Sequence, residues 1–218
     1  MRESISIDWA LIRSLPFDER EREVRRQERA QVRALVGAAA AGDQLCFCDA
    51  LTAMWDATHL WTGAMRKIAQ TPCPDDFRNY FLHHVYLPYG DHIRQEVNNN
   101  RLFANALRSL LPVYHGRGRV VYRGETAWNW RRRTYGLAWS SSKAVAKGYA
   151  TDSLFKFFEG GTVLLRAYAP PTAIICVPAK LDNRYGEDEY VVHPRDLTDI
   201  QVLARFPQVP HDNTTTGE

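Results

Sequence analysis

The chain has 218 residues, of which 45% are hydrophobic and 11% aromatic, and its formal net charge at pH 7 is +3. This composition is too apolar for a disordered chain, and the length is sufficient for one large domain or a compact domain with a smaller one. The mild positive charge allows an acidic or nucleic-acid partner without requiring one, and no apolar run reaches the length of a membrane span, so no membrane partner is expected.

The first part of the chain is predicted to be helical. Asp18 is placed to cap a helix that runs to the alanines before Gly42. Its interleaved glutamates and arginines favour a solvated, salt-bridged face over a basic arm for nucleic acid. A second helix is expected from about Asp43 to Ala69, because large apolar residues recur near the 3.6-residue period.

Two further helices are predicted before the character of the sequence changes. One opens at Pro74 and is broken or kinked at Pro88, and the other carries the apolar residues between Leu102 and Leu111 and ends at Pro112. Residues 1–112 are therefore predicted to form a helical region.

The cysteines give no indication of a metal site. Their spacings match no zinc motif, so we predict reduced and mostly buried thiols and no metal ion. The four residues are Cys46, Cys48, Cys73 and Cys176.

After Pro112 the sequence changes to short apolar runs separated by turn residues, which is typical of strands. One short helix, from about Lys143 to Ala150, is expected among them, and residues 207–218 are predicted to be a disordered tail. The predicted strands are 119–123, 137–141, 161–168, 173–177, 189–192 and 200–206.

Three chemically suggestive pieces occur in this second part. Arg123 stands at the end of an apolar run, and Trp139 precedes the three serines 140–142. The third piece is the pair Glu187 and Glu189. Since alternate side chains of an extended strand share a face, the two glutamates are predicted to project together with the intervening residue turned away.

In this order the pieces resemble the R-S-E class of ADP-ribosyltransferases, known from bacterial toxins and effectors. The pattern of that class is an aromatic residue before Arg, a hydrophobic residue before Ser-Thr-Ser, and then Glu-x-Glu. The resemblance covers about Arg119 to Phe206, and Ser141 stands where the family has threonine. It implies an α+β fold, in which an ADP-ribosyltransferase-like β-sandwich core with short helices, residues 113–206, follows the helical region.

The resemblance implies catalytic roles for the two glutamates. Glu189 matches the family's catalytic glutamate, which stabilises the ribosyl cation as the bond to nicotinamide breaks. Glu187 matches the glutamate that orients and deprotonates an acceptor guanidinium. Tyr185 falls near an aromatic position that recognises the target in the family, although an ordinary surface loop explains this segment nearly as well.

The resemblance also assigns residues to NAD⁺, the co-substrate. Arg123 offers a planar fork for phosphate or ribose oxygens, and the alternative for it is an ion pair with Glu125. Ser140 holds the catalytic glutamate and the ribose in register, whereas Ser142 is expected chiefly to cap the following helix. The aromatic residues before these motif positions, Tyr122 and Trp139, complete the NAD-binding set.

Two further segments leave alternatives open. The aromatic run 154–158 with its lysine is predicted either to fold over nicotinamide or to belong to the core. The run Arg131-Arg132-Arg133 is predicted to be a solvated loop, with contact to an acidic target or to the adenosine phosphates as the alternative.

We therefore predict an NAD-dependent mono-ADP-ribosyltransferase that modifies a macromolecular acceptor, with protein arginine favoured. A nucleic-acid acceptor, NAD hydrolysis, or a non-catalytic NAD- or protein-binding module are the alternatives. An antitoxin or immunity protein is a candidate partner for the helical region. The first residues lack the build of a signal peptide, so we expect a cytoplasmic protein or one delivered into a target cell by other means.

Overall fold

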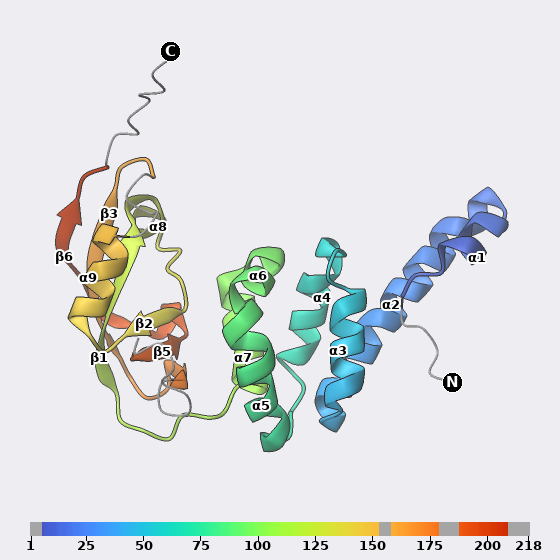
Figure 1. The fold of residues 1–218 in the computed structure, drawn as a ribbon, viewed down its shortest axis with the longest axis horizontal. Helices are drawn as coiled ribbons and strands as arrows, with labels where there is room; N and C mark the ends of the chain where they lie inside the picture. The colour runs from blue at the N-terminus through green and yellow to red at the C-terminus, as the bar shows by residue number, and fades with distance from the viewer. Residues whose placement is uncertain (1–5, 153–157, 179–187, 209–218) are drawn as a thin grey trace, which may run out of the picture. The chain divides into compact units, whose positions relative to one another are not determined.

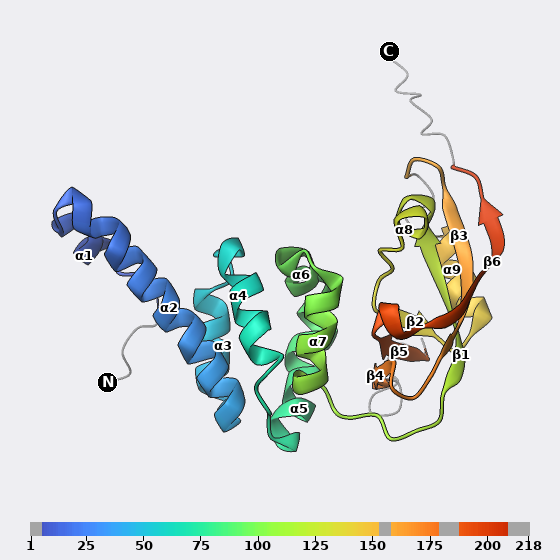
Figure 2. The same ribbon diagram turned by 180° about the vertical axis from the view of Figure 1, so that it is seen from behind.

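The computed structural model describes residues 6–152, 158–178 and 188–208. The chain divides into two compact units, residues 1–112 and 113–218, and Figures 1 and 2 show both from opposite sides. The division falls at the residue where the sequence changes from helical to strand-like patterns. The α+β class expected from the sequence is confirmed, because the first unit is helical and the second contains a sheet.

The helices of the first unit pack around aromatic side chains. Phe47 meets Phe77 and Phe81 edge to face, with ring centroids 5.1 and 5.9 Å apart, and all three rings are buried. The elements are α1 (Trp9–Ser14), α2 (Phe17–Ala41), α3 (Gln44–Ala53), α4 (Thr58–Ile68), α5 (Asp75–Phe81), a π-helical turn (Leu82–Tyr86), α6 (Leu87–Val97) and α7 (Asn100–Leu110).

Two predictions for this unit need correction, and helix α1 is an addition that was not predicted. Asp18 does not cap α2; Pro16 precedes the helix, and Asp18 lies in its first turn, where a carboxylate still favours the helix dipole. The expected helix 43–69 is two helices. In the turn between them Met54 is fully buried, and the ring of Trp55 stacks on that of His92 of α6 with centroids 4.2 Å apart.

Two other predictions for this unit hold. The helical geometry is interrupted near Pro88 by the π-helical turn that directly precedes α6, which suits a residue without a backbone N–H. The salt-bridged face of α2 is also present, since Arg25 pairs with Glu21 at 2.5 Å and Arg26 pairs with Glu23 at 2.7 Å.

The described strands of the second unit form one antiparallel sheet in the order β4-β5-β2-β1-β3-β6. All six predicted strands and the predicted helix are present, and α8 is an addition. The elements are β1 (Arg119–Thr126), α8 (Ala127–Arg132), β2 (Ala138–Ser140), α9 (Lys143–Asp152), β3 (Thr162–Ala169), β4 (Ile174–Cys176), β5 (Glu189–Val192) and β6 (Thr198–Phe206).

The sheet has a narrow joint between β1 and β2. Every residue of β1 has a partner in β3, whereas β1 and β2 are joined at the single register pair Tyr122–Ser140. The described strands thus form one continuous sheet of two halves, β4-β5-β2 and β1-β3-β6. This differs from the expected β-sandwich, in which two separate sheets would face each other.

Strand β1 also continues past Arg123, where the sequence was expected to leave the strand. At Gly124 the absence of a side chain leaves room for α9, which packs directly on the strand. A Cβ atom at position 124 would be 2.5 Å from the backbone nitrogen of Ala150 and 2.6 Å from the carbonyl oxygen of Ala146. The strand then leads into α8, whose first turn is capped by the Thr126 hydroxyl, which accepts a bond of 3.1 Å from the Asn129 N–H.

The two faces of this sheet differ. One face carries the main apolar cluster, which includes Val121, Trp139, Leu165 and Tyr190. The opposite face is packed against α9 along β1 and β3. The four cysteines carry free thiols, of which those of Cys73 and Cys176 are buried. No helix in the described part of the chain is both long and apolar enough to span a bilayer.

Candidate functional site

The joint of the sheet brings three of the predicted site residues into one row. Tyr122 on β1 is the register partner of Ser140 on β2, and Ser140 is the register partner of Glu189 on β5. Register partners present their side chains on the same face of a sheet, and neighbouring strands lie about 4.8 Å apart. Glu189, Ser140 and Tyr122, called the joint row below, therefore occupy consecutive positions across three strands.

Ser140 is held in place by the turn that follows it. Its side chain is buried, and its Oγ accepts a hydrogen bond of 3.0 Å from the Ser142 N–H. The Ser142 hydroxyl in turn accepts from the Val145 N–H at 3.3 Å, so Ser142 caps α9 as expected. The Ser141 N–H donates to the carbonyl oxygen of Asp188 at 3.1 Å, which ties the serine turn to the start of β5.

Glu189 begins β5 and is partly exposed. Its negative charge affects the pKa of Cys176 on the neighbouring strand β4. Burial raises the pKa of the Cys176 thiol to about 12, and the negative charge of Glu189 adds to this rise. A partly exposed carboxylate at a strand end, beside a buried hydroxyl, is suited to meeting a cationic group that approaches the joint.

The other predicted carboxylate, Glu187, and the predicted recognition residue, Tyr185, lie outside the described residues. The predicted shared face of Glu187 and Glu189 therefore also lies outside the described residues. Asp188, which is described, has φ of 45°, in the left-handed region and not in the extended conformation that was expected there. The aromatic run at 154–158 is described only at Phe158, whose side chain is exposed.

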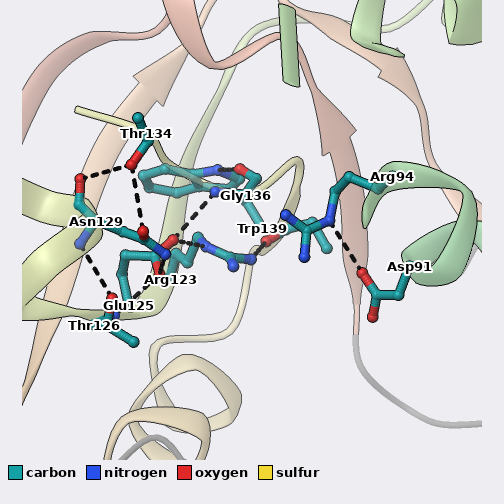
Figure 3. Close-up of polar contacts among 10 residues, drawn as sticks. Asp91, Arg94, Arg123, Glu125, Thr126, Asn129, Thr134, Gly136 and Trp139 are labelled. Atoms are coloured by element: carbon teal, nitrogen blue, oxygen red, sulfur yellow. Dashed lines mark hydrogen bonds and ion pairs between the residues drawn. The ribbon is translucent and has the colours of Figure 1, made fainter. Parts of the chain in front are cut away.

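Arg123 does not join the row. It follows Tyr122 in β1, so its side chain is directed to the opposite face of the sheet, the one that carries Trp139. Its Nε donates to Glu125 Oε2 at 2.8 Å and its Nη1 to the carbonyl oxygen of Ala138 at 2.5 Å, as Figure 3 shows. The ion pair that was the alternative for Arg123 is therefore formed.

Glu125 is the centre of this second cluster. Its side chain is 4% exposed and its two oxygens accept four hydrogen bonds, drawn in Figure 3. The donors are Arg123 Nε, the Thr126 N–H, Asn129 Nδ2 and the Gly136 N–H. Burial alone would raise the pKa of this carboxyl group, but the charge and hydrogen bond of Arg123, with the bonds from Asn129 and Gly136, lower it.

Gly136 closes the cluster over the guanidinium of Arg123. A Cβ atom at position 136 would lie 2.3 Å from Nη2 of Arg123, so any other residue there would push the guanidinium out of this position. Trp139 is 1% exposed and its indole N–H donates to the carbonyl oxygen of Gly136 at 3.0 Å. Trp139, predicted as an NAD contact, is thus placed in the core behind the site, where it supports Gly136.

Sequence reasoning missed the extent of the Glu125 cluster and one cation beside the joint row. Arg123 and Glu125, two residues apart in a strand, were a readable signal for a same-face ion pair. Arg166 on β3 is the register partner of Tyr122, and it extends the joint row by one strand. It is partly buried and forms no ion pair with a described residue. Arg166 could have been found only from the strand register.

Comparison with protein-family models, with curated proteins and with solved structures finds no match to this chain. Within residues 6–152, 158–178 and 188–208, no three histidine, cysteine, aspartate or glutamate side chains are grouped so as to hold a metal ion.

Proposed function

We propose that the protein is an NAD-dependent mono-ADP-ribosyltransferase that transfers ADP-ribose to a macromolecular acceptor, with protein arginine favoured. The observation that carries the proposal is the joint row. Three residues that are far apart in the sequence, each matching a position of the R-S-E pattern, become neighbours at the narrow joint of the sheet. Glu189, Ser140 and Tyr122 are therefore assigned to the NAD⁺ site.

The reaction assigned to this site breaks the bond between C1′ of the ribose and the nicotinamide nitrogen. The bonding electron pair leaves with nicotinamide, and the ribose becomes an oxocarbenium ion that the Glu189 carboxylate stabilises. Ser140 holds Glu189 and the ribose in register. A nitrogen of the acceptor then bonds to C1′ and loses a proton, for which the resemblance assigns Glu187 as the base.

The cation for the pyrophosphate needs a revised assignment. Arg123 is bonded to Glu125 and to a carbonyl oxygen on the core face, whereas Arg166 lies on the face of the joint row. We assign Arg166 to the pyrophosphate of NAD⁺ and give Arg123 the role of positioning β1 against β2. A guanidinium is suited to this task because it stays charged and grips phosphate oxygens bidentately.

The test uses the purified full chain with NAD⁺ labelled in the adenylate part and a cell lysate. Protein label, nucleic-acid label and free nicotinamide are measured separately for the wild type and the Glu189→Gln variant. We expect protein label that falls by about 10²–10³-fold in the variant, since loss of a group that stabilises transition-state charge typically has this effect. Label that also disappears in Glu187→Ala supports arginine as the acceptor.

The matched control is Asp199→Asn. It removes one carboxylate from the exposed edge strand β6, and asparagine tolerates the φ of 52° found at this position. Equal loss of label in both variants would contradict a specific role for Glu189. Label on nucleic acid would identify the other acceptor class, and nicotinamide release without label would identify a glycohydrolase. No NAD turnover with any lysate would leave a binding module and overturn the proposal.

A further inference from the structure

The surface of α8 combines one exposed and one partly buried indole ring with arginines. Trp128 is 49% exposed, and the guanidinium of Arg132 lies 3.8 Å from the centre of its ring. The guanidinium of Arg205, on β6, lies 4.2 Å from the ring centre of Trp130. With Arg131 and Arg133, which are both exposed, these side chains form what we call the α8 surface.

Among the described residues, no carboxylate pairs with the arginines of the α8 surface. No side chain of its four arginines forms an ion pair or hydrogen bond with a residue that the structure describes. The arginines of α2 contrast with this, since Arg25 and Arg26 are paired with glutamates of the same helix. The α8 surface is therefore a local excess of positive charge, which attracts a polyanion.

In α8, two arginines lie next to the ring of Trp128. Residues three and four positions apart lie on the same side of a helix, so Arg131 and Arg132 both flank Trp128. Arg131 also lies close to the backbone of Gly160, since a Cβ atom at Gly160 would be 3.3 Å from its Nη2. A guanidinium stacked on an indole keeps its N–H groups free at its edge, so it can bind phosphate while its plane stays stacked.

We infer that the α8 surface binds single-stranded nucleic acid. Stacking of bases on exposed aromatic rings, combined with arginines that follow the phosphates, is how proteins hold single strands without reading their sequence. A duplex offers its phosphates but not the faces of its bases, and an acidic peptide offers charge but few planar groups. The exposed ring within the cationic surface therefore favours the single strand. This inference does not rest on the proposed transferase activity, because binding requires no NAD⁺.

The experiment measures fluorescence anisotropy of labelled oligothymidylate and oligouridylate, each about twelve nucleotides long, with the full chain and without NAD⁺. At physiological salt we expect a dissociation constant of about 10⁻⁶–10⁻⁴ M, and tighter binding at low salt. Engagement of all four arginines gives a slope of log K against log salt of about −3.

Two variants separate stacking from charge. Trp128→Ala removes a stacking ring and is expected to weaken binding about tenfold with an unchanged salt slope. The double variant Arg132→Gln/Arg205→Gln is expected to weaken binding about tenfold and to make the salt slope shallower by about 1–2 units. Circular dichroism spectra equal to that of the wild type show that the variants are folded.

The matched control is Arg25→Gln/Arg26→Gln in α2, which removes the same number of charges from an exposed helix. It is expected to leave the affinity within about twofold of the wild type, because those arginines are already neutralised. Equal weakening by the control, binding that Trp128→Ala leaves unchanged, or absence of binding at low salt would each overturn the inference. So would duplex DNA or polyglutamate that competes as well as the single strand.

Discussion

Tyr122 and Arg123 are neighbours in β1, but they belong to two regions of opposite character. Tyr122 is part of the joint row, whose members are held by strand register and whose carboxylate is partly exposed. Arg123 is part of the Glu125 cluster, which is buried and nearly closed by its own hydrogen bonds. One strand thus provides a candidate binding face on one side and a structural polar core on the other. The resemblance that placed both residues at NAD⁺ did not distinguish these sides.

The largest expected effect comes from opening the Glu125 cluster. Glu125→Ala removes the acceptor of four hydrogen bonds and leaves Arg123 without its counter-charge. Truncating one partner of a buried pair typically lowers the free energy of unfolding by about 3–5 kcal/mol. Urea unfolding measures this loss. Replacing both partners, in Arg123→Met/Glu125→Leu, should recover part of this loss. If Glu125→Ala destabilised the protein no more than Asp199→Asn does, the structural role of Glu125 would be contradicted.

Arg166 and Arg123 lie on opposite faces of the sheet, so substituting each one tests which of them contacts NAD⁺ and which stabilises the fold. Arg166→Ala is expected to raise KM for NAD⁺ about tenfold with little change in stability, since a charge-assisted phosphate contact contributes about 1.5–3 kcal/mol. Arg123→Lys is expected to lower the free energy of unfolding by about 1–3 kcal/mol, because lysine cannot form the same fork of bonds. Steady-state kinetics and urea unfolding of both variants measure this, and the reverse pattern would return Arg123 to the NAD⁺ site.

The pKa of Glu125 gives a pH test of the same cluster. Its pKa is lowered in the folded state, and a free glutamate has a pKa of about 4.3. The ionised cluster therefore contributes its full stability above that free value and loses it as the pH falls through the folded-state pKa. In Glu125→Gln this contribution is absent at every pH, so the difference in unfolding free energy from the wild type should shrink as the solution is acidified. A difference that stays constant with pH would contradict an ionised Glu125.

The sequence predicted the strands of the second unit and the interruption at Pro88, because these depend on local periodicity and on proline chemistry. It did not predict which face each site residue occupies. Arg166 becomes a neighbour of Tyr122 only through long-range strand pairing, and no local pattern encodes that register. Helix α8 was also missed; its Thr126 cap is a local signal, whereas the burial of Ala127 depends on the tertiary fold. Nor did the sequence predict the left-handed conformation of Asp188, which had been expected to be extended.

The smallest expected effect separates two serines that lie two residues apart. Ser142 caps α9, so Ser142→Ala should lower the free energy of unfolding by about 1 kcal/mol and leave NAD turnover near the wild-type rate. Ser140 lies in the joint row, so Ser140→Ala should reduce kcat at least about tenfold, because it removes a positioned hydroxyl beside Glu189. Thermal unfolding and turnover of both variants measure this contrast. Equal losses of activity would mean that Ser140 and Ser142 act together and that Ser142 also contributes to the NAD⁺ site.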